Sequence, residues 1–283
     1  MSTYVAIGSV CWDQVDGDDE RRLGGSVLFS SRIAHAAGWD AHIVTSGTPE
    51  LERALREALP DIKVTVQRSA TDTVMWFPRN ADVGPQAVPT VAEPLDLTRS
   101  PVDLAAADVI HLAPIMGEVT PGLLDQVRGS RFVGITPQGL LRTRDPVTHR
   151  LGLLEAPVAW WAEGADAVVL SESEFARLDG SPDERPGSAS SPLRSGADPI
   201  SDHQPRGGAV AVTRGERGCF GSSGDEVVDL PGIPIDQLSP TGSIGAGDVF
   251  ASTLFVALAG GHGFPEAMDR ANRRAAAHVA GHP

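Results

Sequence analysis

Short apolar runs rich in Val, Ile, Leu and Ala alternate along this chain with segments of helical composition. Runs of this kind are typical of strands that are buried on both faces of a sheet. The expected strands are residues 4–8, 41–46, 62–67, 108–112, 132–135, 167–170 and 209–213, and the expected helices are residues 26–38, 51–59, 123–127, 248–259 and 265–280. This alternation predicts an α/β fold of three layers, αβα, in which helices cover both faces of a mostly parallel sheet.

Two parts of the chain interrupt the alternation. A strand-like run at residues 73–77 leads into a Pro-rich stretch, and with the region after the first strand it predicts a small β lid from about 12–25 and 71–94. Residues 181–208 are rich in Ser, Pro, Gly and charge, which predicts a disordered surface insertion, with a docking segment as the less favoured interpretation. No internal repeat is evident, so we expect a single domain over residues 1–283.

Composition narrows the class of function. The formal net charge is −14, without a basic stripe, which argues against a nucleic-acid partner. The two cysteines, Cys11 and Cys219, form no metal-binding or disulfide pattern and fit a reducing, cytoplasmic setting. The first ten residues contain no basic region followed by a long apolar stretch, so we expect neither a signal peptide nor a membrane partner.

The most informative motif is Gly245-Ala246-Gly247-Asp248, followed by the apolar start of an expected helix. Bare glycine backbone and a helix N-terminus together can bind an anion such as a phosphate. A carboxylate at that place repels a bound phosphate, but it can take the proton from a hydroxyl that attacks the phosphate. A plain helix start with an acidic first turn is the alternative interpretation of these four residues.

Further candidates follow other strands, at the edge where ligands bind in such sheets. Ser171 and Glu174 come after residues 167–170, where Glu174 can hold hydrated Mg²⁺, or the pair can form a capping box. The stretch from Thr213 to Gly218 offers close backbone approach to a nucleotide, with Arg214 or Arg217 offsetting phosphate charge. It also fits a turn that leads into a hairpin of residues 219–220 and 227–230, and both interpretations can hold.

Residues for an acceptor molecule are expected at the same edge. Asp13 follows the first strand and can accept hydrogen bonds from two hydroxyls of a polyol. Gly24 and Gly25 precede a helix and allow close approach, or simply form a turn, and Arg142 ends a stretch that follows another strand. Glu118 and the eight histidines are expected to serve the surface or the core. The sequence lacks GxxxxGK[ST], which excludes a P-loop mechanism.

Taken in order, these motifs resemble the ribokinase-like (PfkB) family of carbohydrate kinases across nearly the whole chain, and TPQGLLR at residues 136–142 is similar to an inositol-kinase-like branch. The resemblance implies a ribokinase-like fold, ATP and Mg²⁺ as cofactors, and a homodimer formed through the lid. It implies Asp248 as general base with Gly245, Ala246 and Gly247 as anion hole; substrate contacts at Asp13, Gly24, Gly25 and Arg142; the metal at Glu174; and nucleotide contacts at Ser171, Thr213, Arg214, Gly215, Gly218 and Asn272.

Three positions depart from the family pattern. Gly242 stands where the family usually has an acidic residue, Ser171 where it has asparagine, and Phe29 where an asparagine contacts a substrate hydroxyl. The expected function is an ATP-dependent kinase of a small sugar, cyclitol or related polyol. A nucleoside kinase of the same family and a catalytically weak sugar-binding regulator are the alternatives, and the sequence does not choose the substrate.

Overall fold

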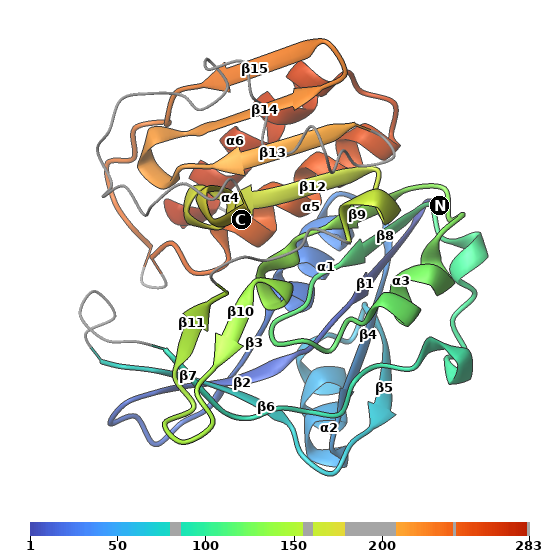
Figure 1. Ribbon diagram of the computed structural model, residues 1–283, viewed down its shortest axis with the longest axis vertical. Helices are drawn as coiled ribbons and strands as arrows, with labels where there is room; N and C mark the ends of the chain where they lie inside the picture. Colours follow the sequence, from blue (N-terminus) through green and yellow to red (C-terminus); the bar gives the residue numbers. More distant parts are fainter. Residues whose placement is uncertain (80–85, 155–160, 179–207, 240–241, 282–283) are drawn as a thin grey trace.

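A nine-stranded sheet forms the centre of the structure, a computed structural model that describes residues 1–79, 86–154, 161–178, 208–239 and 242–281 (Figure 1). Seven neighbouring strands are parallel, and an antiparallel hairpin extends them at one edge. The strand order is β15 (Glu226–Leu230), β14 (Cys219–Ser223), β13 (Ala209–Thr213), β12 (Ala167–Ser171), β9 (Val133–Ile135), β8 (Val109–Leu112), β1 (Thr3–Ile7), β4 (Asp40–Gly47) and β5 (Lys63–Arg68). The predicted α/β fold is confirmed.

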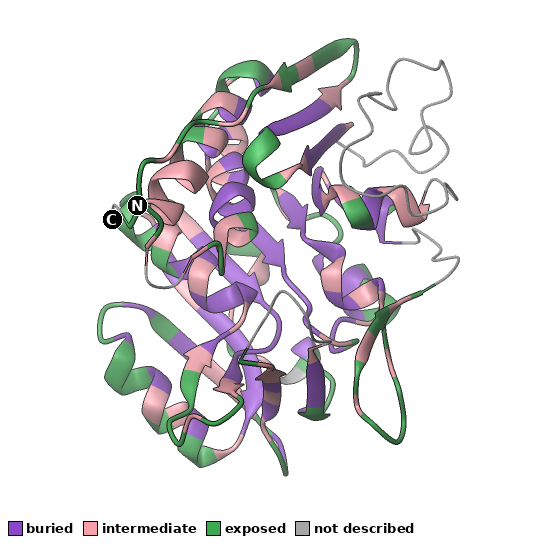
Figure 2. Cartoon of the chain, turned by 90° about the vertical axis from the view of Figure 1, so that its left-hand side faces the viewer, coloured by how far each residue is buried: buried purple, intermediate pink, exposed green. Residues whose placement is uncertain are grey.

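Apolar cores lie on both faces of this sheet, because successive side chains of a strand point to opposite sides. Tyr4 and Ala6 of β1 belong to one buried cluster, and Val5 and Ile7 belong to the other. The first cluster contains side chains of α1 (Ser26–Ala36), α2 (Pro49–Ala58), α5 (Ala246–Ala259) and α6 (Phe264–Val279), and the second those of α3 (Pro121–Val127) and α4 (Glu172–Leu178). Figure 2 shows the buried central strands between partly exposed helices.

A second, four-stranded sheet lies beside the central one. Its order is β3 (Arg22–Gly24), β2 (Cys11–Val15), β6 (Thr73–Phe77) and β7 (Ala87–Thr90), so it comes from the two segments of the expected lid. A short pair of strands, β10 (Arg142–Arg144) and β11 (Leu151–Leu153), was not expected. The predicted insertion at residues 181–208 lies, except for Gly208, outside the described residues. The lid dimer and the cytoplasmic location stay predictions. In the part of the chain that is described, every helix is too short or too polar to cross a bilayer.

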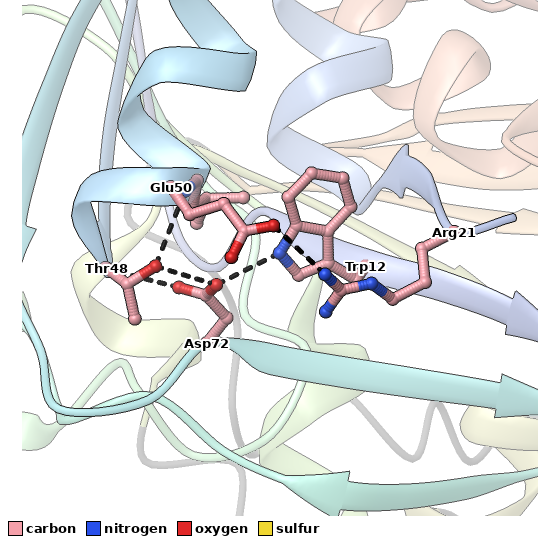
Figure 3. A network of polar contacts seen from close by, with 6 residues as sticks. Trp12, Arg21, Thr48, Glu50 and Asp72 are labelled. Carbon is pink, nitrogen blue, oxygen red and sulfur yellow. Dashed lines mark hydrogen bonds and ion pairs between the residues drawn. The ribbon is translucent and has the colours of Figure 1, made fainter.

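The four-stranded sheet is tied to the central domain through Asp72, the residue before β6 (Figure 3). Its carboxylate accepts hydrogen bonds from the backbone N of Thr48 at 2.6 Å, from the Thr48 hydroxyl at 3.0 Å and from Trp12 Nε1 at 3.0 Å. Thr48 caps α2, and Trp12 belongs to β2. One carboxylate therefore joins a strand of each lid segment to a helix of the central domain.

We expect Asp72→Ala to lower the free energy of unfolding by about 2–3 kcal/mol, because hydrogen bonds to a charged group are among the stronger ones and three donors lose their partner. Urea unfolding followed by tryptophan fluorescence measures the change. Arg21→Ala is the matched control: Arg21 pairs with Glu50 at 3.1 Å in the same network (Figure 3), but both side chains are largely exposed. Its loss should cost less than about 1 kcal/mol. Equal effects of the two variants would contradict the role given to Asp72.

Candidate active site

The carboxyl ends of the parallel strands meet at one edge of the sheet, and the predicted site residues gather there. Ser171 ends β12 and pairs in register with Thr213, which ends β13. Helix α5 starts beside them at Ala246, immediately after Gly245. Gly245 has φ of 79°, a left-handed conformation that glycine adopts without strain. The structure thus brings the glycine motif next to the ends of two neighbouring strands.

A cavity of about 250 Å³ lies between these elements, and we call it the phosphate cavity. Among the residues that the structure describes, the carboxylates of Glu174 and Asp248 belong to its lining, and no Lys or Arg does. Backbone N–H groups and the N-terminus of α5 supply positive potential in the lining, and the charge of Arg142 reaches Asp248 from outside it. The lining consists of Thr136, Gln138, Val169, Leu170, Ser171, Glu174, Thr213, Ser243, Gly245, Gly247 and Asp248.

Asp248 has the environment of a general base. Burial raises the pKa of Asp248 to about 6, while a hydrogen bond from the Ser26 side chain and the charge of Arg142 act in the opposite direction. The charge of Glu174 adds to the rise. A carboxylate with this pKa is ionised at neutral pH and accepts a proton more readily than an exposed aspartate does. Asp248 lies in the first turn of α5, so it stands beside the amides that would bind the phosphate.

Glu174 forms the capping box expected from its spacing to Ser171. The Ser171 backbone N donates to Glu174 Oε2 at 2.7 Å, and the Glu174 backbone N donates to Ser171 Oγ at 3.3 Å. This reciprocal pair is the capping box that starts α4. The capping box holds a nearly buried carboxylate in the wall of the phosphate cavity, so structural and ligand-binding roles are compatible.

A second pocket of about 270 Å³ continues from the phosphate cavity, since Thr213, Ser243 and Gly247 line both. We call it the donor groove. Most of its wall is apolar, with the Asn272 amide as a polar exception whose Nδ2 donates to the Pro231 carbonyl at 3.0 Å. The groove is lined by Thr213, Gly215, Glu216, Gly218, Gly232, Ile233, Ile235, Leu238, Ser243, Ala246, Gly247, Phe250, Asn272, Ala275, Ala276 and Val279.

Arg214, expected among the nucleotide contacts, does not line this groove. Its guanidinium pairs with Asp229 of β15 at 2.5 Å and donates to the carbonyl oxygens of Cys219 and Leu230. It also stands 5.4 Å from the centre of the Phe220 ring. The hairpin after β13 therefore engages this side chain, a contact that could not be predicted from the sequence because only strand pairing brings Asp229 close to Arg214.

The acceptor residues meet around the Gly24–Gly25 pair. Burial raises the pKa of Asp13 to about 6, and a hydrogen bond from the Cys11 thiol opposes that rise. A Cβ atom on Gly24 would lie 2.0 Å from Asp13 Oδ2, so glycine is required for this approach. Ser26, the next residue after the pair, donates to Asp248. The glycine pair thus joins the expected substrate carboxylate to the expected base.

Arg142 stands between these groups. Its Nη1 donates to the Ile115 carbonyl at 3.4 Å. Burial lowers the pKa of Arg142, and three nearby carboxylates act in the opposite direction, those of Glu174, Asp248 and Glu118. The charge of Arg142 therefore acts on both carboxylates of the phosphate cavity and on Glu118.

Three residues at the site were not foreseen from the sequence. Glu118 is almost fully buried, and its carboxylate accepts the backbone N–H groups of Ser9, Ile115 and Met116, each at 2.7 Å. It thereby fixes the loops after β1 and β8. Phe29 packs against Gly245, and His278 is bonded to the carbonyl of Ile244 directly before it. Their positions could not be found by spacing, because each contact joins distant segments.

The fold and the site define a class: α/β kinases with a β lid and a glycine-rich anion turn. Residues 142–282, about half of the chain, match the family described as pfkB family carbohydrate kinase. The chain belongs to this ribokinase-like family of phosphotransferases, which act on an alcohol group. The predicted family and enzyme class are confirmed. A search of curated proteins gave no match.

Several solved structures resemble this chain over nearly its whole length. A pyrophosphate-dependent kinase of the ribokinase family, complexed with a pyrophosphate analogue and myo-inositol, is 18% identical, with a TM-score of 0.77 over 99% of this chain and 96% of that one. Ribokinase from Thermotoga maritima is 19% identical, with a TM-score of 0.69 over 99% and 93%. Arabidopsis thaliana ribokinase complexed with ribose and ATP is 18% identical, with a TM-score of 0.71 over 99% and 93%. At these identities the likeness establishes the fold.

Proposed function

We propose that this protein is an ATP-dependent kinase that phosphorylates a hydroxyl of a small sugar, cyclitol or related polyol. The observation that supports this most directly is the phosphate cavity, in which Gly245, Gly247, Glu174 and Asp248 line one space. Backbone amides there favour a phosphoryl group, and the neighbouring carboxylate favours proton uptake from an attacking hydroxyl. Asp13 and Arg142 provide the polar contacts for a polyol on the other side of the glycine pair.

The reaction in this proposal is a direct transfer. Asp248 accepts the proton of the acceptor hydroxyl as that oxygen bonds to the terminal phosphorus of the donor, and the bond from that phosphorus to the leaving diphosphate breaks. The amides of Gly245, Ala246 and Gly247 stabilise the negative charge on the transferring group, a kind of contribution worth about 3 kcal/mol per donor. Asp13 orients the acceptor by accepting hydrogen bonds from its hydroxyls.

The cavity also fits Mg²⁺ through Glu174. No group of three or more His, Cys, Asp and Glu residues in the described ranges forms a ready-made metal site. Mg²⁺ does not need one, since one or two carboxylates usually hold it together with water and substrate phosphates. Glu174 would hold it here through a bound water. When bound, the ion offsets charge on the donor phosphates, which matters in a lining without Lys or Arg.

The donor groove supports a nucleotide as donor. Its wall carries Ile233, Ile235, Phe250 and Val279, which suit the faces of a purine, and Asn272 offers an amide to the base edge. Pyrophosphate has no part that would fill an apolar groove. Pyrophosphate is nevertheless the second candidate donor, because a similar fold belongs to a pyrophosphate-dependent kinase.

Single-turnover transfer with the purified protein tests the proposal. The label is supplied either in the terminal phosphate of ATP or in pyrophosphate, with Mg²⁺ and a panel of sugars, cyclitols and nucleosides. We expect labelled phosphate ester from ATP and a polyol. Transfer from pyrophosphate alone would contradict ATP as the donor. Transfer to nucleosides alone would contradict a sugar, cyclitol or related polyol as the acceptor. Polyol binding without transfer would favour a regulatory sugar-binding protein.

Gly24→Ala is expected to raise the KM for the acceptor at least about tenfold, with little change in the KM for ATP. The added Cβ would stand within 2.0 Å of Asp13 Oδ2, so the carboxylate must move away from its place, and misplacement of this order is costly. Initial rates at varied acceptor and donor measure both constants. Gly122→Ala is the control, because its Cβ meets only Thr120 Oγ1 at 4.0 Å. Equal acceptor KM values in the two variants would contradict the role of Gly24 in the acceptor site.

A further inference from the structure

The final turn of α6 is bonded to both ends of the segment that precedes the glycine motif. His278 Nε2 donates to the Ile244 carbonyl at 2.8 Å, directly before Gly245. The Ser239 backbone N donates to the Val279 carbonyl at 2.8 Å. Neither contact is needed to form α6, whose own backbone bonds end at Ala280. The helix therefore bonds to the chain at Ser239 and at Ile244, the residue directly before the anion-binding turn, Gly245–Gly247.

Phe29 of α1 supports the same turn from another side. A Cβ atom on Gly245 would lie 2.8 Å from Phe29 Cδ1, so the ring is packed against the glycine backbone. The rings of Phe29 and His278 meet edge to face, with centroids 6.3 Å apart and planes at 78°. Position 29, where the family pattern has asparagine, thus carries a ring that packs against Gly245. The Phe29 ring contacts Gly245 of the anion-binding turn, and the imidazole is bonded to Ile244 directly before it.

The same helix forms part of the donor groove. Asn272, Ala275, Ala276 and Val279 of α6 line it, and His278 stands in the turn that carries Val279. A molecule in the groove thus rests on the helix whose last turn is bonded to Ile244. The groove and the anion-binding turn are joined by one rigid element and one side-chain hydrogen bond.

We propose that His278 is a positioning residue for phosphoryl transfer: through Ile244, and with Phe29 packed against Gly245, it sets the place of the amides that bind the terminal phosphate. This inference rests on the proposed kinase function. His278 touches neither the phosphate nor the acceptor in this account. The charge of His278 also lowers the pKa of Asp248 directly. The effect on phosphate binding passes through the backbone of the anion-binding turn, so it should act on the terminal phosphate and leave the groove contacts of the nucleotide unchanged.

Two variants separate the hydrogen bond from the ring. His278→Phe keeps an aromatic ring against Phe29 but has no donor for the Ile244 carbonyl, whereas His278→Gln keeps an N–H donor at a similar reach. We expect His278→Phe to lower kcat about tenfold or more, with the acceptor KM unchanged. His278→Gln should keep most of the wild-type kcat. The control is Arg273→Gln on the same helix, an exposed side chain paired with Asp269. Thermal unfolding of each variant shows whether the fold is kept.

Nucleotide binding gives a readout that does not depend on an acceptor. Isothermal titration measures the affinity for AMP and for an unreactive ATP analogue with Mg²⁺. AMP reports on the donor groove alone, and the analogue reports on the groove together with the anion-binding turn. We expect His278→Phe to weaken the analogue about fivefold to tenfold, the range that one lost hydrogen bond gives, and to leave AMP unchanged. Equal weakening of both ligands, or none, in a variant with normal unfolding would overturn the inference. A wild-type protein that binds neither nucleotide would instead contradict the proposed donor.

Discussion

Asp248→Asn is expected to keep the fold and bind ATP, yet to lose turnover by about 10²–10⁴-fold, the usual contribution of a general base. Asparagine has nearly the same shape as aspartate, so the contact with Ser26 and the start of α5 can be kept. It cannot take up the proton of the acceptor hydroxyl. Measurement of kcat at saturating donor and acceptor tests this, and an undiminished rate would remove Asp248 from its role.

The pH dependence follows from the raised pKa. Burial places the pKa of Asp248 at about 6, so the base is ionised above pH 6 and protonated below it. In the wild-type protein kcat should therefore fall as the pH drops from 7 to 5. Asp13, also with a pKa of about 6, should add to the loss through acceptor binding. In Asp248→Asn, kcat at saturating acceptor should no longer fall as the pH drops from 7 to 5.

Asp248→Asn should stabilise the folded protein at neutral and higher pH, although it lowers the activity. The pKa of Asp248 lies above that of an unfolded aspartate, about 3.9, so the folded state disfavours the ionised form. This penalty is absent below about pH 4, grows as the pH rises to about 6, and is constant above it. Asp248→Asn should accordingly raise the Tm at pH 8 and leave it unchanged near pH 3.5. Asp269→Asn, at an exposed carboxylate paired with Arg273, is the control and should leave turnover unchanged.

The central sheet was predictable because each parallel strand carries its own apolar signal. The run at residues 4–8 is buried on both sides in the fold, and the structure places it as β1 with Tyr4 and Val5 in opposite cores. The site was predictable for a related reason: residues that follow parallel strands meet at one edge. Ser171 and Thr213 were both expected at this edge, and the structure shows that they pair in register.

The direction in which a side chain points could not be predicted from the sequence. Arg214 follows β13 as Thr213 does, but its guanidinium engages Asp229 of a later strand, while Thr213 lines both pockets. Glu118 gave no signal because its partners are backbone N–H groups, which every residue has. Contacts such as these depend on which loops the fold brings together. Local pattern determines the element, and only tertiary packing determines what its side chains meet.

Gly245→Ala is the second change from which we expect a large effect, a loss in kcat of at least about 100-fold. Alanine at φ of 79° is strained by about 1–2 kcal/mol, and its Cβ would stand 2.8 Å from Phe29 Cδ1, so the anion-binding turn must shift. Displacement of a catalytic group by about 1 Å costs about that much in rate. Steady-state kinetics with thermal unfolding as a companion measurement tests the expectation.

Two further variants separate the strain from the clash. Gly242→Ala carries the strain alone, since Gly242 has φ of 58° and no atom within 4 Å of the added Cβ, so its rate should fall far less. The double variant Phe29→Ala with Gly245→Ala removes the ring that the Cβ meets. If the clash moves the turn, the double variant should be more active than Gly245→Ala alone, a coupling that independent sites do not show. Additive losses would mean that Phe29 does not limit position 245, and that the effect of alanine arises from backbone strain.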